Sequence, residues 1–161
     1  MSEEKTRSVE SEGILQLVSF KIGAEEFGVD ILGVQEIIKM MKLTEVPNAP
    51  EFVDGVVNLR SKIIPVVDLR SRLGLNRSAH SKDTRIIVLE LLSNTIGFIV
   101  DEVSEVLRIP KNITEPPPSL LAGINSEVIF AIAKLEDRLL ILIDLNKIFN
   151  INEVRALRDV A

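Results

Sequence analysis

The chain of 161 residues has no cysteine, no tryptophan, no tyrosine and only one histidine. Without cysteine it can form neither disulfide bonds nor thiolate metal sites, and it has no thiol nucleophile. The single histidine, His80, lies in NRSAHSKDT, a run of small and polar residues that predicts a loop with nothing to orient the imidazole ring. We therefore expect His80 to be a solvated loop residue, not a general base or a metal ligand.

An excess of basic residues and a long apolar run are also missing. Lys and Arg number 19 against 24 Asp and Glu, and the formal net charge of -5 argues against nucleic-acid binding. The longest apolar runs, such as Leu139 to Ile143, are far too short to cross a bilayer. The acidic start MSEEKTRSVESEG lacks the apolar segment of a signal peptide. We expect a cytoplasmic protein that does not insert directly into membranes.

Apolar residues make up 46% of the chain and fall into short runs rich in Ile, Val and Leu, separated by turn residues. This close spacing is typical of an all-β sandwich or barrel. Pro65 lies inside one of these runs, which predicts an edge strand or a bulge because proline cannot donate a hydrogen bond to a sheet. The predicted strands cover residues 15–22, 25–30, 36–40, 55–60, 62–68, 85–92, 95–101, 105–109, 128–135 and 138–144.

Three aspartates mark short helical turns between the strands. Asp30, Asp68 and Asp144 each end an apolar run and precede a few residues of helical pattern, so their side chains are predicted to cap those turns. Gly74 and Asn150 are predicted to end the last two turns.

An internal repeat divides the chain into two related halves. FGVDILGVQEII at 27–38 aligns with IGFIVDEVSEVL at 96–107, an offset of 69, and IIPVVDLRSRLGL at 63–75 aligns with LLILIDLNKIFNI at 139–151, an offset of 76. Halves this small bury little surface alone, so we expect two small five-stranded barrels that share an apolar core. The predicted organisation is a flexible N-terminus at 1–13, a first barrel at 14–80, a second at 81–151, and a C-terminal helix at 152–161.

The repeat helps to separate scaffold from function. A residue type present at both equivalent positions is explained by the fold, whereas a type found in one half only is freer to serve a function. Asp68 recurs as Asp144, which favours helix capping over catalysis at both positions. Gly28 recurs as Gly97, which suits a tight or bulged entry into a strand.

The tip of one predicted hairpin, NLRS, has no counterpart in the second half. Asn58, Arg60 and Ser61 align there with a lysine, a glutamate and an aspartate. Arg60 is interpretable as a solvated charge or as the anchor of a protein interface, and the residues alone leave both readings open. Arg70 and Arg72, further along, are predicted to lie on an exposed helical face.

A small hydrolase built on Asp68, Asp101 or Asp144 with Asn58 and Arg60 is the enzymatic alternative. The chain lacks the pattern of an activated nucleophile, of a metal-ligand cluster and of a phosphate-binding loop. We therefore expect a protein without enzymatic activity, cofactor or metal.

Several longer segments occur in an order that resembles the CheW family of chemotaxis coupling proteins, over about residues 15–150. They are FGVDILGVQEI, VPNAPEFVDGVVNLRSKIIPVVDL, IIVLE, GFIVDEVSEVLRI and RLLILIDLNKI. The resemblance implies two SH3-like barrels and a non-enzymatic scaffold that couples the cytoplasmic helical hairpin tip of chemoreceptors to the regulatory domain of the histidine kinase CheA. It also implies recruitment to membrane receptor arrays. The alternative is the same module in another chemosensory pathway, such as pilus motility or development.

The resemblance also implies contact residues. In the family, the receptor hairpin lies in a groove between the barrels, and the kinase domain docks edge to edge on a barrel. Arg60 stands at the arginine of the family's Asn-Leu-Arg-Gly motif, where Ser61 replaces the glycine and is expected to strain the turn or change its type. The implied partner-binding residues are Arg60, Asn58, Val34, Glu36, Gly55, Ile86, Gly97 and Val106.

Overall fold

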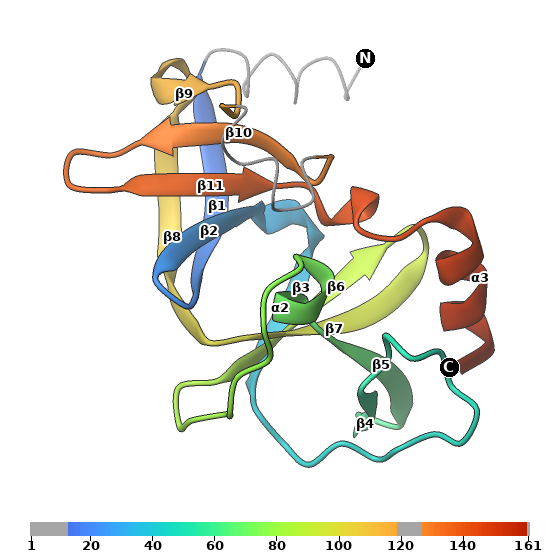
Figure 1. Cartoon of the computed structure of the whole chain (residues 1–161). Coiled ribbons are helices and arrows are strands. Elements are labelled where there is room, and N and C mark those ends of the chain that lie inside the picture. The colour runs from blue at the N-terminus through green and yellow to red at the C-terminus, as the bar shows by residue number, and fades with distance from the viewer. Residues whose placement is uncertain (1–12, 119–126, 161) are drawn as a thin grey trace.

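Every apolar run predicted as a strand forms one in the computed structural model, which describes residues 13–118 and 127–160 (Figure 1). The strands form two curled sheets. The six-stranded sheet has the order β8 (Glu102–Pro110), β1 (Ile14–Ile22), β2 (Glu25–Asp30), β11 (Leu139–Ile143), β10 (Ile129–Lys134) and β9 (Thr114–Glu115). The five-stranded sheet has the order β3 (Val34–Lys39), β6 (Arg85–Leu91), β7 (Asn94–Val100), β5 (Lys62–Asp68) and β4 (Gly55–Leu59). The predicted all-β fold is confirmed, with the two-residue strand β9 as an unpredicted addition.

Each sheet takes strands from both halves of the repeat. Strands β1 and β2 lie beside β8, β10 and β11, while β6 and β7 lie between β3 and β5. Two parallel pairings make this exchange: Gly28 lies opposite Leu142, and Gly97 lies opposite Val66. The two pairs are related by the offsets of 69 and 76, so the molecule has internal two-fold pseudosymmetry. The predicted barrels at 14–80 and 81–151 are therefore wrong as spatial units, because each barrel is completed by strands from the other half.

The three predicted caps are confirmed. The carboxylate of Asp30 accepts a hydrogen bond from the N–H of Leu32 at 2.9 Å, at the start of the short 3-10 turn η1 (Ile31–Gly33). Asp68 accepts from Arg70 at 3.0 Å at the start of α2 (Leu69–Arg72). In the same way, the N–H of residue 146 donates at 3.0 Å to Asp144, which opens η4 (Leu145–Lys147).

The ends of these turns differ in one case from the prediction. Gly74 follows α2 with a φ of +82°, a left-handed conformation that glycine adopts without strain, as predicted. Asn150, in contrast, opens the C-terminal helix α3 (Ile151–Val160). Its side chain accepts a hydrogen bond from the N–H of Glu153 at 2.9 Å, and its own N–H donates to the Glu153 carboxylate at 3.0 Å. This reciprocal capping box explains why the helix begins there.

Pro65 lies neither on an edge strand nor at a bulge. It pairs with Val56 of β4 in a register without shifts, and the parallel pairing of β5 with β7 begins one residue later, at Val66. The missing N–H of the proline therefore falls just before that ladder starts, where no hydrogen bond is lost.

Apolar side chains form three clusters. The largest joins the two sheets and includes Phe20, Phe27 and Phe98, all with no measurable exposure. Two smaller clusters fill the sheets themselves, one around Leu142 and the other around Ile86. The shared core predicted for two small barrels is thus present, and the cores within the barrels are separate.

The remaining described segment of regular structure is the 3-10 turn η2 (Lys111–Ile113), between β8 and β9. No helix within residues 13–118 and 127–160 is long and apolar enough to cross a membrane. The N-terminus predicted to be flexible spans residues 1–13, of which residues 1–12 lie outside the described part of the chain.

The strand exchange predicts the behaviour of a cut chain. We expect that a protease site inserted between Ala79 and His80, in the exposed connection between the halves, can be cleaved without separating them. Both sheets would hold the fragments together, so the cut protein should elute from a gel-filtration column as one species of unchanged size. Separation of the fragments under native conditions, with the uncut insertion variant as control, would contradict the exchanged topology.

Candidate interaction surfaces

The eight predicted contact residues do not form one surface. Asn58, Arg60 and Val106 are exposed, while Val34 and Glu36 are partly buried. The other three are buried and cannot touch a partner directly in this conformation; they are Gly55, Ile86 and Gly97.

Arg60 and Ser61 form the tight turn between β4 and β5. Their φ values of +52° and +69° are those of a type I′ hairpin turn. Both residues therefore have the left-handed conformation that strains a non-glycine residue, and the expected strain at Ser61 is present. The Leu92–Ser93 turn between β6 and β7 has nearly the same angles, +49° and +68°.

Arg60 is not an isolated solvated charge. Its guanidinium donates two hydrogen bonds to the carboxylate of Glu36 on β3, one of them at 3.0 Å from Nη2 to Oε1. Because β3 and β4 lie at opposite ends of the five-stranded sheet, this ion pair closes the seam of that barrel. The Arg60 side chain is still 74% exposed, so it can meet a partner while paired.

The two repeated glycines permit close contact between strands. Neither has a positive φ, and both lie inside strands, so the predicted tight or bulged entry is wrong. A Cβ atom on Gly97 would lie 2.7 Å from Cγ2 of Ile86, and one on Gly28 would lie 3.2 Å from a methyl of Leu142. Gly97 and Ile86 are thus packing neighbours, and any influence of theirs on a partner passes through the sheet.

Gly55 has a similar role at the edge of β4. A Cβ atom there would lie 2.8 Å from the carbonyl oxygen of Thr44, which accepts a hydrogen bond from the N–H of Val56 at 2.9 Å. Glycine allows the segment before the hairpin to cover the end of the sheet, where Thr44 and Val56 form a β-bridge.

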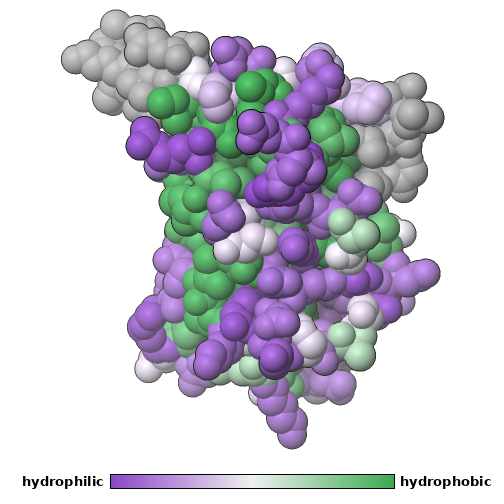
Figure 2. Space-filling view, turned by 90° about the vertical axis from the view of Figure 1, so that its left-hand side faces the viewer, coloured by the Kyte–Doolittle hydropathy of each residue, from purple (hydrophilic) through white to green (hydrophobic). Residues whose placement is uncertain are grey.

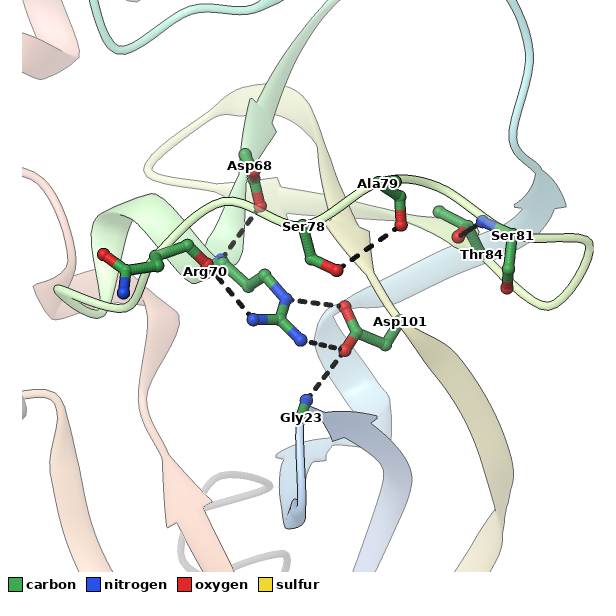
Figure 3. A network of polar contacts seen from close by, with 9 residues as sticks. Gly23, Asp68, Arg70, Ser78, Ala79, Ser81, Thr84 and Asp101 are labelled. Carbon is green, nitrogen blue, oxygen red and sulfur yellow. Dashed lines mark hydrogen bonds and ion pairs between the residues drawn. The ribbon is translucent and has the colours of Figure 1, made fainter.

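Arg70 and Arg72 are both partly buried, so the exposed helical face predicted for them is wrong. The guanidinium of Arg70 binds both carboxylate oxygens of Asp101, at 3.0 and 2.6 Å, and also donates to the carbonyl of Asn76 (Figure 3). The N–H of Gly23 donates to the same carboxylate at 2.7 Å. The hydrogen bonds from Arg70 lower the pKa of Asp101, partial burial opposes this, and the Gly23 N–H supports it.

Arg72 holds the C-terminal helix against the body of the protein. It binds both carboxylate oxygens of Glu153, at 2.8 and 2.9 Å, and its guanidinium lies against the rings of both Phe52 and Phe149. Burial alone would raise the pKa of Glu153, but the hydrogen bonds from Arg72 and from the backbone N–H of Asn150 outweigh it and lower the pKa. The partly buried arginine therefore ties α3 to the body of the protein through an ion pair and two cation–π contacts.

Arg77 occupies a junction between the two sheets, next to Arg70. It binds both oxygens of Asp54 at 2.9 Å and approaches Asp68 to 3.6 Å. Burial is the main cause that raises the pKa of Asp68, the N–H of Arg70 offsets part of it, and Asp54 adds to it. We call this cluster the filled junction; it consists of Gly23, Asp54, Asp68, Arg70, Arg77 and Asp101.

The pseudosymmetric counterpart of the filled junction is an open pocket. It is a cavity of about 840 Å³ formed by the ends of β2 and β11, β6, the segment around β9, and the turns η1 and η4. Its apolar lining includes Val29, Leu32, Leu89, Phe130, Ile143 and Leu145. Its charged lining consists of Asp30, Glu90, Glu115, Asp144 and Lys111.

Leu32 and Phe130 are the functional candidates that our sequence reasoning missed. They are 75% and 47% exposed, unusual for apolar residues of this size, and both line the open pocket. The repeat offsets align Leu32 with Asp101 and Phe130 with Asp54. An apolar residue aligned with a charged one in the other half was the signal that could have identified them.

Apolar side chains also reach the surface elsewhere. Figure 2 shows them in patches between hydrophilic residues on the face at the left of Figure 1. Large exposed apolar residues on the strands of the six-stranded sheet include Ile14, Val106 and Leu139.

The carboxylates of the hydrolase alternative are used by the scaffold. Asp68 and Asp144 cap helical turns, and Asp101 is bound by Arg70. His80 is exposed in its loop. Within the described residues, no group of three or more acidic or histidine side chains is placed to hold a metal ion.

Two pseudosymmetric barrels with an apolar pocket at one junction define a protein-interaction scaffold. Residues 16–153 match the model of the CheW-like domain family. Chemotaxis protein CheW of Treponema pallidum is 33% identical over 90% of this chain and 88% of that protein, and CheW of Klebsiella aerogenes is 34% identical over 91% and 88%. The crystal structure of scaffolding protein TtCheW from Thermoanaerobacter tengcongensis is 42% identical, covers 86% of this chain and 94% of its own, and superposes with a TM-score of 0.77.

The chain therefore belongs to the CheW-like domain family. It is a chemotaxis adaptor and not an enzyme, and its family couples chemoreceptors and CheA in chemotaxis.

The contacts of Gly97 and Gly28 predict that replacement by alanine lowers stability by different amounts at these two equivalent positions. Gly97→Ala should lower the free energy of unfolding by about 1 to 3 kcal/mol, because the new methyl group meets the branched side chain of Ile86. Gly28→Ala, the matched control, should cost less because its nearest contact is the end of a leucine side chain. Urea unfolding of both variants measures the difference, and equal costs would contradict the packing role assigned to Gly97.

Proposed function

We propose that this chain joins the helical hairpin tip of a chemoreceptor to the regulatory domain of CheA through two separate surfaces. The receptor tip occupies the open pocket and the adjoining strand β3, and the kinase domain docks on the β8 edge of the six-stranded sheet. Binding to receptors recruits the chain to membrane arrays. The observation that carries the proposal is the exposure of Leu32 and Phe130 in the open pocket, at positions that are charged in the filled junction.

The open pocket suits an amphipathic helix. Its interior is apolar, its rim is polar, and apolar grooves between packed elements bind helices through side chains spaced one turn apart. Leu32 and Phe130 would bury their exposed surface only when such a partner is bound, which supplies the hydrophobic driving force for association.

The strand β3 extends this surface from the pocket toward the hairpin tip. Leu32 lines the pocket and immediately precedes β3, and Gln35 on that strand donates to Glu90 of the pocket at 2.6 Å. Glu36 follows and binds Arg60. A helix lying in the pocket can therefore reach Val34, Glu36, Arg60 and the neighbouring Asn58 along one line.

The β8 edge is available for a second partner. In the described sheet, β8 pairs with β1 on one side and is the terminal strand on the other. Val106 is 58% exposed on this strand. An edge strand with an exposed apolar residue is suited to docking against another barrel of similar construction, and this is the arrangement expected for the kinase domain.

The two-surface proposal predicts that binding of the two partners can be lost separately. Leu32→Asp and Phe130→Asp give the open pocket the aspartates of the filled junction, and each should weaken binding of a soluble receptor-tip fragment about tenfold or more. Binding of the CheA regulatory domain should remain. Val106→Asp should weaken binding of the CheA regulatory domain and leave binding of the receptor-tip fragment unchanged.

Titration calorimetry at micromolar concentrations measures the affinity for each partner, since we expect a binding free energy of about -8 kcal/mol for contacts of this kind. Ile151→Asp, which places the same charge on an exposed apolar position of α3, is the control and should change neither affinity. Wild-type receptor binding by both pocket variants would refute the assignment of the pocket.

Exchanging the charges of Arg60 and Glu36 tests whether the pair is recognised or only closes the barrel. Arg60→Glu and Glu36→Arg alone should each lower the melting temperature slightly, because the Arg60 side chain is exposed and solvent screens the pair. The double exchange should restore the melting temperature but not receptor-dependent activation of CheA. Recovery of both properties would mean that the pair serves the fold alone.

A further inference from the structure

The filled junction and the open pocket are two versions of one structural site. Val56 lies opposite Pro65 in the five-stranded sheet as Ile132 lies opposite Ile141 in the six-stranded sheet, and both pairs are related by the offset of 76. Asp68, the last residue of β5, and Asp144, which directly follows β11, stand at equivalent positions and cap the next turn in the same way. Whatever lies against one aspartate therefore indicates what the other can bind.

In the filled junction, this chain supplies its own cation. Arg77 enters from the connection between the halves, binds both oxygens of Asp54 and reaches Oδ2 of Asp68 at 3.6 Å. Arg70 and Asp101 occupy the remaining space with a second ion pair (Figure 3). The junction is thus closed by two arginines.

No arginine is among the described residues that line the open pocket, and of the three aspartates of the filled junction only Asp68 aligns with an acidic residue. Asn146 replaces Arg70, and it places both of its hydrogen bonds on Oδ1 of Asp144. Oδ2 of Asp144 accepts no hydrogen bond from any described residue, and Asp144 lines the cavity. The carboxylate is therefore placed like that of Asp68, without the cation.

The charge around the pocket also favours a cationic ligand. Four carboxylates line it, those of Asp30, Glu90, Glu115 and Asp144, against the single ammonium of Lys111. Of the rim carboxylates, Glu115 is paired with Lys134 at 2.9 Å. The others leave a negative field over an apolar interior, which attracts a long side chain with an apolar stem and a basic end.

We propose that the helix bound in the open pocket inserts an arginine or lysine whose charged end binds Oδ2 of Asp144, as Arg77 approaches Asp68 in the filled junction. The stem of this side chain lies along Leu32 and Phe130, and the ring of Phe130 adds a cation–π contact. This inference rests on the proposed binding of a receptor helix in the pocket and adds the chemistry of its anchor.

The test uses the full chain and a soluble fragment carrying a chemoreceptor hairpin tip. Asp144→Asn removes the charge but keeps the oxygen that caps η4, so the melting temperature should not fall. Affinity for the fragment should drop about 5- to 20-fold, and its salt dependence should weaken. Asp68→Asn is the matched control, because Asp68 caps α2 in the same way in the filled junction, outside the open pocket, and it should change affinity less than twofold.

The partner's anchor is found by replacing each Lys and Arg of the fragment by Met in turn. One position should lose affinity with wild-type protein and lose almost none with Asp144→Asn, as a double-mutant cycle requires. Wild-type affinity of Asp144→Asn, equal losses from Asp68→Asn, or the absence of any coupled position would overturn the anchor. If Leu32→Asp still abolishes binding in that case, the receptor groove stands; if it does not, the proposed function fails as well.

Discussion

The parallel pairing of β2 with β11 and of β7 with β5 is the contact on which the rest of the structure depends. Each pairing joins strands from different halves, so neither barrel is complete without the other half. The pairing requires glycine at positions 28 and 97, because side chains of the neighbouring strands occupy the space above them. The same pairing places the large apolar cluster between the two sheets. Packing within this cluster therefore fixes the position of one barrel relative to the other.

The two junctions show how one repeated site acquires different roles. Where aspartates and arginines line the junction, it closes on itself through Arg70, Arg77 and their carboxylate partners. Where Leu32, Phe130 and Asn146 stand instead, the same backbone leaves an apolar cavity. These substitutions, together with the lack of an arginine such as Arg77 among the described lining residues, separate a self-contained junction from a surface that needs a partner.

Features that depend on neighbouring residues were predictable from the sequence, and those that depend on distant partners were not. The strands follow from short apolar runs, and Asp30, Asp68 and Asp144 cap turns two residues away. Arg70 and Arg72 were misplaced because their partners lie 31 and 81 residues further along the chain. The offsets revealed the repeat, but alignment cannot tell which copy of a strand pairs with which, so the exchange between barrels was missed. Arg60 was identified as a candidate because the second half has no arginine at the aligned position. Leu32 would have been identified only by noting that an apolar residue there aligns with the charged Asp101.

The exchange of strands also constrains how such a chain can have originated. A single half would supply β1, β2, β3, β4 and β5 or their equivalents, yet it could not pair its own β2 with its own β5 in this arrangement. The smallest folding unit is therefore a pair of identical halves, each completing the other. Joining the two halves in one polypeptide replaces a concentration-dependent association by an intramolecular one. Each molecule then contains two halves, one copy of each. Once the halves were no longer required to be identical, their two junctions could diverge, and symmetry ceased to limit the molecule to two equal faces.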